Sequence, residues 1–244
     1  MRGKLAVFVT SRRRDRMCPM SELKNIRAVI FDMDGLLLDS EKISLATFIE
    51  ACRENNYEPD VSDYYRCIGT TPPKTREILM DAYGSAFPYQ AVSDLWRKKF
   101  NEQALNYPIP LKDGVLDVLK FLESRGIEKA VVTSTYQEPA RKMLSNANIV
   151  RFFGFIIGGD EITHGKPDPE IYLAACRKLG ESPADCLALE DSNNGVLSAS
   201  AAGLMVIQVP DLVEPSEDVK AMGHKIVKSL VDVLAEFDSE HPGS

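Results

Sequence analysis

The chain has 244 residues, of which 44% are hydrophobic and 27% are charged, and its formal net charge is −7. This composition is typical of a globular enzyme, and the acidic balance argues against a nucleic-acid-binding protein, which would present a basic face. No apolar run approaches the ~20 residues of a membrane-spanning helix, and five cysteines without a C-x-x-C pair favour free thiols in the cytoplasm.

Residues 1–24 differ from the rest of the chain. They contain a basic run, Arg12 to Arg14 with Arg16, and an apolar run at residues 5–9 that is too short for the core of a signal peptide. These residues show neither helix-capping signals nor hydrophobic periodicity. We therefore expect a disordered extension, or a working protein that begins at Met20.

The first expected strand covers residues 28–31 and runs into the turn Asp32-Met33-Asp34-Gly35. A polar stretch with helical periodicity follows at residues 44–107, interrupted at Gly69, at Pro72-Pro73 and at Pro88. A proline-rich linker at residues 107–110 closes this stretch. We expect residues 44–107 to form a helical domain inserted between two parts of a core domain, residues 25–43 and 108–240.

Short apolar runs alternate with helical patterns in the rest of the chain. The patterns predict strands at residues 130–132, 155–157, 186–189 and 205–209, and helices at residues 115–124, 138–146, 169–179, 194–202 and 230–237. Continuously apolar strands between helices are typical of a parallel sheet covered on both faces. The predicted fold class is therefore α/β, with a doubly wound, mostly parallel, Rossmann-like sheet and an inserted helical domain.

Polar side chains follow four of the expected strands. They are Asp32 and Asp34 after the first strand, Thr133 and Ser134 after the second, Lys166 after the third, and Glu190 and Asp191 at the end of the fourth. Parallel sheets bind ligands at the carboxyl ends of their strands. Four carboxylates in one place require a cation, and all-oxygen ligands favour Mg²⁺. Hydroxyls and a lysine beside that ion are suited to hold a phosphoryl group.

Taken singly, these features have ordinary structural explanations. Asp-x-Asp-Gly is a common turn, Thr133-Ser134 and Asp191-Ser192 resemble helix N-caps, and most loop lysines are simply solvated. We expect His164, in the same loop as Lys166, to be such an ordinary loop residue. The placement of all the other groups at successive strand ends is what favours an active site.

Four motifs resemble those of the haloacid dehalogenase superfamily. They are FDMDGLLLDSE at residues 31–41, VVTS at 131–134, GKPDP at 165–169 and LEDS at 189–192, in the order that the family has. The Glu-Asp pair and the insert after the first motif resemble the β-phosphoglucomutase-like subgroup, which includes phosphosugar phosphatases. The resemblance implies a Mg²⁺-dependent phosphoric monoester hydrolase with a helical cap.

The resemblance also implies roles for individual residues. Asp32 is the nucleophile and Asp34 the general acid and base, while phosphate is bound by Thr133, Ser134 and Lys166. The implied ligands of Mg²⁺ are Asp32, the backbone carbonyl of Asp34, Glu190 and Asp191. Cap residues near the substrate are Gly69, Thr70 and Thr71.

The mutase of this subgroup is the main alternative. It carries an arginine shortly after the cap glycine that binds a second phosphate, whereas here Pro72 falls near that position. Lys74 or Arg76 elsewhere would not reproduce a bidentate grip, so hydrolysis is favoured over phosphate transfer within a hexose phosphate. Two other classes fit the sequence less well. A receiver-type phosphoaspartate switch has no second aspartate two residues after its phosphoacceptor, and a haloalkanoate dehalogenase has no aspartate at the position of Asp34. We expect a monomer acting on a small phosphate ester, a sugar or nucleoside monophosphate, with no nucleic-acid or membrane partner.

Overall fold

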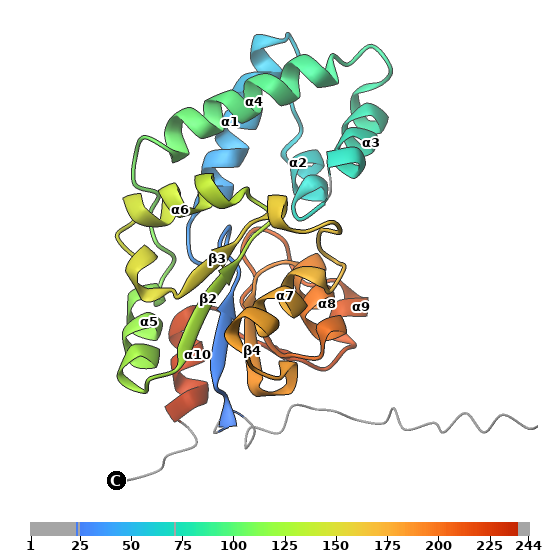
Figure 1. The fold of residues 1–244 in the computed structure, drawn as a ribbon. Helices are drawn as coiled ribbons and strands as arrows, with labels where there is room; N and C mark the ends of the chain where they lie inside the picture. Colours follow the sequence, from blue (N-terminus) through green and yellow to red (C-terminus); the bar gives the residue numbers. More distant parts are fainter. Residues whose placement is uncertain (1–22, 24, 71, 239–244) are drawn as a thin grey trace, which may run out of the picture.

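The computed structural model of the protein describes residue 23 and residues 25–70 and 72–238. A sheet with helices on both faces forms one part, and helices from residues 40 to 104 lie beyond one end of its strands (Figure 1). Met20, Thr71 and nearly all of the expected N-terminal extension lie outside the described residues. Leu23, within the predicted extension, is instead buried, because it packs into the core of the sheet domain.

The sheet has the strand order β3-β2-β1-β4-β5-β6, and every neighbouring pair is parallel. The strands are β1 (Ala28–Phe31), β2 (Glu128–Val132), β3 (Phe155–Ile157), β4 (Cys186–Glu190), β5 (Met205–Gln208) and β6 (Lys225–Ile226). The predicted α/β class with a parallel Rossmann-like sheet is thereby confirmed. β6 was not predicted, because two exposed residues give no apolar pattern.

Alternate residues of β1 face opposite cores. Val29 and Phe31 belong to one buried cluster, whereas Ala28 and Ile30 belong to the other, as the two-residue period of a strand requires. The first cluster packs under α5 (Val115–Ser124), α6 (Gln137–Asn146) and α10 (Leu230–Asp238). The second packs under α7 (Glu170–Leu179), α8 (Asn193–Ala202) and the short α9 (Glu217–Lys220).

The predicted helices agree with these bounds to within one residue at their starts. α5 spans the predicted residues, whereas α7 begins at Glu170 and has Pro169 as its N-cap, one residue later than expected. Three-residue 3₁₀ turns at Val150–Phe152, Gly159–Glu161 and Pro183–Asp185 complete the connections. None of the helices in the described part of the chain is long and apolar enough to cross a bilayer.

The insert consists of α1 (Ser40–Glu54), α2 (Val61–Cys67), α3 (Pro72–Tyr83) and α4 (Tyr89–Ala104). These helices bury a cluster of their own, which includes Phe48, Tyr64, Leu79, Phe87 and Val92. The first helix begins at Ser40, four residues before the expected start of the insert. A separate cluster of this kind suits an independent cap, and we interpret α1–α4 as that cap.

Two chain segments connect the insert to the sheet, and they lie side by side. Leu38 forms an antiparallel bridge with Leu111. The Asp39 amide donates to the Pro110 carbonyl at 2.9 Å, and the Lys112 amide donates to the Leu37 carbonyl at 3.1 Å. Because both connections are paired with each other, they fix where the insert meets the carboxyl edge of the sheet.

Candidate active site

A cavity of about 300 Å³ lies at the carboxyl edge of the sheet, under the insert. Most of the candidate residues from the sequence line it: Asp32, Asp34, Gly69, Thr70, Thr133, Ser134, Lys166 and Asp191. Glu190 lies behind this lining, with none of its surface exposed. The topology therefore brings residues from the loops after four strands, together with the loop after residue 67, into one small space.

Lys166 is the centre of the buried charges. Its ammonium nitrogen lies 2.6 Å from Asp32 Oδ1 and 2.5 Å from Glu190 Oε1, and its side chain is only 6% exposed. Burial alone would lower the pKa of Lys166, but the charges of Asp32 and Glu190 outweigh it and raise that pKa above its ordinary value. Lys166 therefore stays charged beside the candidate nucleophile.

Glu190 contacts Lys166, Tyr172 and Gly195. The Tyr172 hydroxyl donates to its Oε1 at 2.5 Å, in addition to Lys166. Gly195, in the first turn of α8, faces the carboxylate so closely that any side chain there would collide with it. A glycine at this position thus allows the glutamate to approach the N-terminal end of a helix, which favours a negative charge.

Asp32, Glu190 and Asp191 each offer a ligand atom, and these atoms lie within 4.8 Å of one another. Burial raises the pKa of Asp32 well above its ordinary value, and Lys166 opposes that rise. Burial, followed by the charges of Asp32 and Glu190, likewise raises the pKa of Asp191. The three carboxylates carry more negative charge than Lys166 balances, so the group is suited to bind a cation.

Asp34 has hydroxyl partners on both of its oxygens. The Ser40 hydroxyl donates to Oδ1 at 2.7 Å, while the hydroxyls of Thr133 and Thr135 donate to Oδ2 at 3.1 and 2.9 Å. Thr133 Oγ1 also accepts from the Thr135 amide at 3.0 Å. Sequence reasoning missed Ser40 and Thr135. Ser40 lies within the first motif and Thr135 directly follows the second, and their hydroxyl groups were the available signal.

The two phosphate-binding candidates after β2 differ in exposure. Thr133 is buried, whereas Ser134 is exposed at the cavity wall. Two glycines, Gly158 and Gly159, pack against this loop so tightly that a side chain on Gly159 would collide with the Ser134 carbonyl. The close packing fixes the backbone that presents Thr133 and Ser134 to the cavity.

The insert reaches the site through the loop after α2. Gly69 has a positive φ of 68°, and its carbonyl accepts a hydrogen bond from the Asn194 side chain at the start of α8. The Thr70 hydroxyl donates to the Cys67 carbonyl at 2.7 Å and contacts the Thr75 hydroxyl. Gly69 thus contacts the sheet domain directly, while much of the hydrogen-bonding capacity of Thr70 is used within the insert.

Helices of the insert add further residues to the cavity wall that the sequence had not indicated: Glu41 and Ser44 from α1, and Phe100 from α4. Glu41 Oε2 accepts a hydrogen bond from the Tyr64 hydroxyl at 2.6 Å. Burial raises the pKa of Glu41 to about 7, although the bond from Tyr64 opposes the rise. The part of the cavity wall that the insert contributes therefore includes hydroxyls, a carboxyl group and an aromatic ring.

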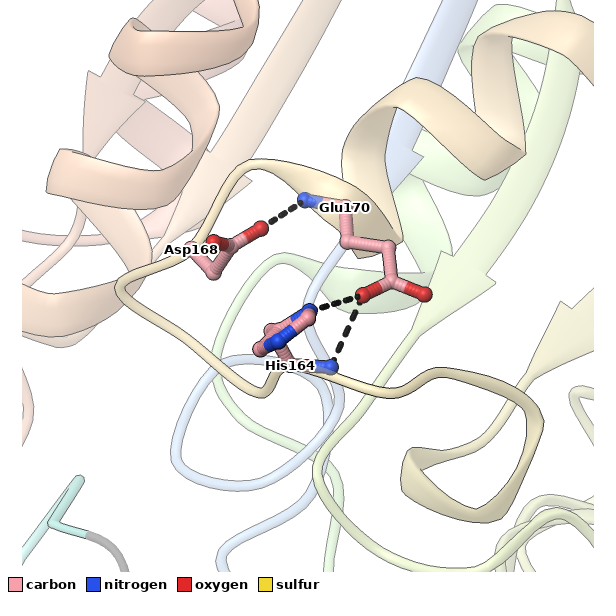
Figure 2. Close-up of side chains that lie close together, drawn as sticks. All are labelled: His164, Asp168 and Glu170. Atoms are coloured by element: carbon pink, nitrogen blue, oxygen red, sulfur yellow. Dashed lines mark hydrogen bonds and ion pairs between the residues drawn. The ribbon is translucent and has the colours of Figure 1, made fainter.

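Figure 2 shows a second cluster of side chains with potential metal ligands. It consists of His164, Asp168 and Glu170 around the loop that carries Lys166. Glu170 accepts from the Thr163 and His164 amides at 2.9 and 2.8 Å, and its Oε2 lies 3.0 Å from His164 Nδ1. Asp168 accepts from the Glu170 amide at 2.9 Å. These contacts order the loop and satisfy the start of α7, so we assign the group a structural role.

Comparison with known proteins places this geometry in a family. The family model described as haloacid dehalogenase-like hydrolase matches residues 29–209. The phosphorylated carbohydrates phosphatase of Thermotoga maritima is 32% identical, over 81% of this chain and 90% of the relative. The phosphoglycolate phosphatase of Aquifex aeolicus is 30% identical, over 83% of this chain and all of the relative.

A solved structure agrees with these sequence matches. The crystal structure of CbbY from Rhodobacter sphaeroides in complex with phosphate is 27% identical and superimposes with a TM-score of 0.71. The alignment covers 87% of this chain and 99% of that one. The match therefore includes the helical insert as well as the sheet, and it confirms the resemblance drawn from the four motifs.

Proposed function

The chain belongs to the haloacid dehalogenase-like hydrolase family, and we propose that it is a Mg²⁺-dependent phosphatase that forms a covalent phosphoaspartate on Asp32. Relatives named as phosphatases support the reaction class, hydrolysis of a small phosphoric monoester. One observation carries the proposal. Asp32 is a buried carboxylate in contact with Lys166, and it lines the same small cavity as Asp34.

In the first step a carboxylate oxygen of Asp32 attacks phosphorus, and the bond from phosphorus to the alcohol oxygen breaks. Asp34 gives a proton to that leaving oxygen. Lys166, Thr133 and Ser134 bind the phosphoryl oxygens, whose charge spreads in the transition state. The products of this step are the free alcohol, the aspartyl phosphate and an ionised Asp34.

In the second step Asp34 removes a proton from a water molecule, whose oxygen attacks the phosphorus of the aspartyl phosphate. The bond to Asp32 breaks, inorganic phosphate leaves, and Asp34 is protonated again. Ser40 and Thr135 hold the Asp34 carboxylate at the cavity wall through this cycle. The same side chain therefore serves as acid and then as base.

The donor set fits Mg²⁺. Asp32, the Asp34 carbonyl, Glu190 and Asp191 offer only oxygens, which this hard cation prefers, and the three carboxylates are buried together. A bound ion neutralises negative charge on the phosphoryl group. Because Lys166 and Tyr172 already occupy Glu190 Oε1, we assign the main ligand roles to Asp32 and Asp191.

Hydrolysis is favoured over a mutase reaction by the charges around the cavity. Lys166 is the one cation among the described residues that line it. Lys74 pairs with Glu77 at 2.7 Å, and the Arg76 guanidinium lies over the Tyr89 ring. A second phosphate group would therefore find no second cation among the described residues of the cavity wall, in agreement with the proline near the expected arginine position.

We further propose that the insert is a cap that covers the bound substrate. The cap, residues 44–107 together with the start of α1, encloses a sugar or nucleoside monophosphate above the core domain. Ser40, Ser44 and Thr70 line the cavity, and hydroxyl oxygens that already donate a hydrogen bond can still accept one from a polyol. The net charge of −7 and buried free cysteines support a monomer in the cytoplasm that binds neither nucleic acid nor membranes.

The test is a panel of sugar, polyol and nucleoside monophosphates assayed for phosphate release with Mg²⁺. The wild-type protein and Asp32→Asn are compared, since an amide cannot form the acyl phosphate. We expect the variant to lose about 10³-fold or more in kcat. A folded Asp32→Asn protein that keeps more than a few per cent of wild-type turnover would contradict the covalent mechanism.

A further inference from the structure

Asp211 lies at the same edge of the sheet as the catalytic carboxylates, although no pattern in the sequence singles it out. It follows β5 by three residues, and the Val209 amide still pairs with the Glu190 carbonyl at 2.7 Å. Gln208, at the end of β5, donates to the Asp191 carbonyl at 3.1 Å. The end of β5 is therefore in direct contact with the segment that carries Asp191.

The Asp211 side chain is buried and only half satisfied. It is 6% exposed, and its Oδ1 accepts from the Lys112 ammonium at 2.5 Å. Its Oδ2 is buried and has no hydrogen-bond partner among the described residues. An ionised carboxylate only accepts hydrogen bonds, and leaving one buried oxygen without a donor is unfavourable. A donor from outside the protein would satisfy the free oxygen.

Gly35 shows where that oxygen points. A side chain on Gly35 would collide with Asp191 Oδ2 and would lie 3.4 Å from Asp211 Oδ2. The two carboxylate oxygens therefore approach the same face of the loop that begins with Asp32. Asp191 is one of the three carboxylates that can hold a metal ion.

Lys112 explains how Asp211 keeps this orientation. Its ammonium lies 3.9 Å from Asp39 Oδ1, in addition to the 2.5 Å contact with Asp211, and both residues 39 and 112 belong to the paired connections between sheet and insert. The lysine binds Oδ1 of Asp211, while the paired connections hold the lysine in place.

We propose that Asp211 is a positioning residue for the metal site: its Oδ2 accepts a hydrogen bond from a water molecule bound to the cation that Asp32 and Asp191 hold. The inference rests on the proposed function. Mg²⁺ usually keeps several of its waters in proteins, and carboxylates that accept from these waters strengthen metal binding. A purely structural Asp211 would serve only to pair with Lys112.

Asp211→Asn separates these two roles. The amide oxygen can still accept from Lys112, but the amide nitrogen is a donor and cannot accept from a metal-bound water. We expect the Kd for Mg²⁺, measured by calorimetry without substrate, to rise about 10- to 100-fold. Glu214→Gln makes the same change on an exposed residue of the same loop, and its Kd should stay within about twofold of wild type.

The outcomes distinguish this inference from the proposed function. If the wild-type protein neither binds Mg²⁺ nor releases phosphate, both are wrong. If the wild-type protein does both, and the Kd of Asp211→Asn for Mg²⁺ lies within about twofold of the wild-type Kd, only the role of Asp211 is wrong. If Asp211→Asn fails to fold, Asp211→Ser is measured instead, because it removes the carboxylate and has a smaller side chain. A rise of about 10- to 100-fold in its Kd for Mg²⁺ would support the role of Asp211, and a Kd within about twofold of wild type would contradict it.

Discussion

The ammonium nitrogen of Lys166 lies 2.6 Å from Oδ1 of Asp32, although 134 residues separate the two in the chain. β1 and the loop after β3 lie on either side of β2, so the contact depends on the order of strands in the sheet. Burial raises the pKa of Asp32 well above its ordinary value, and the positive charge that this contact places beside the candidate nucleophile opposes that rise.

The first prediction follows from this contact. Lys166→Met keeps the length of the side chain but removes its charge, so Asp32 and Glu190 lose their buried partner. We expect kcat to fall about 10²- to 10³-fold, and the free energy of unfolding without metal to fall by about 3–5 kcal/mol. Urea unfolding and steady-state phosphate release measure the two effects. Lys142→Met, on an exposed lysine of α6, is the control, and an equal loss there would contradict the argument.

The second prediction concerns Asp34. Asp34→Asn can neither protonate the leaving group nor activate water, so steady-state turnover should be nearly abolished. With p-nitrophenyl phosphate the first step needs little acid assistance, and we expect a burst of about one p-nitrophenol per active site followed by a stall. Rapid-mixing absorbance measures the burst. Unchanged steady-state rates would remove Asp34 from the mechanism, and Asp113→Asn, on an exposed aspartate, serves as control.

The sequence predicted the sheet and the residues at its strand ends for a physical reason. Continuous apolar runs such as Val29 to Phe31 identify buried strands, and chain order then places Asp32 and Asp191 at one edge. Ser40, Thr135 and Glu41 were not predicted. Each acts through a side chain whose partner is set by packing between distant elements, as in the bond from Tyr64 to Glu41.

Asp211 is a clearer example of a residue whose position could not be predicted from the sequence. Its burial and orientation depend on Lys112, which lies 99 residues away in the connection from the insert. Local periodicity contains no information about such a pair, and Asp211 falls just beyond a strand whose end had been predicted at residue 209. Only the paired connections and the sheet together bring the two side chains into contact.

The third prediction is the metal dependence. Activity should disappear with EDTA and return with Mg²⁺, because buried carboxylates around Asp32 otherwise repel the phosphate dianion. Ca²⁺ should bind without restoring turnover, since it prefers more ligands at longer distances. Phosphate release at matched ionic strength measures both. Full activity in a metal-free preparation would remove the roles given to Asp32 and Asp191 as ligands.

The fourth prediction concerns pH and Glu41, whose pKa burial raises to about 7. A carboxyl group with a raised pKa holds its proton more tightly in the folded state. Its ionisation therefore destabilises the fold as the pH rises from its unfolded pKa of about 4.5 to about 7. Relative to wild type, Glu41→Gln should gain about 2–3 kcal/mol of unfolding free energy between about pH 5 and pH 8.

Urea unfolding in EDTA at several pH values measures this difference. Glu138→Gln, on an exposed residue of α6, is the control and should show no such gain, because its side chain lies in solvent. If the unfolding free energies of Glu41→Gln and wild type changed in parallel with pH across this range, Glu41 would ionise freely at the cavity wall.

The last prediction is the substrate class. The cavity has a volume of about 300 Å³, so it admits a small ester and excludes a phosphopeptide or an oligonucleotide end. Every phosphate ester satisfies Lys166 and Thr133 equally, so discrimination depends on the part of the cavity wall that the insert contributes. That wall presents hydroxyls and Glu41, which suit a neutral polyol and repel a second anion. We expect kcat/KM for a sugar monophosphate to exceed that for the bisphosphate of the same sugar by about tenfold or more. Glu41→Gln should narrow this ratio by relieving the repulsion, whereas a wild-type preference for bisphosphates or phosphopeptides would contradict the assignment.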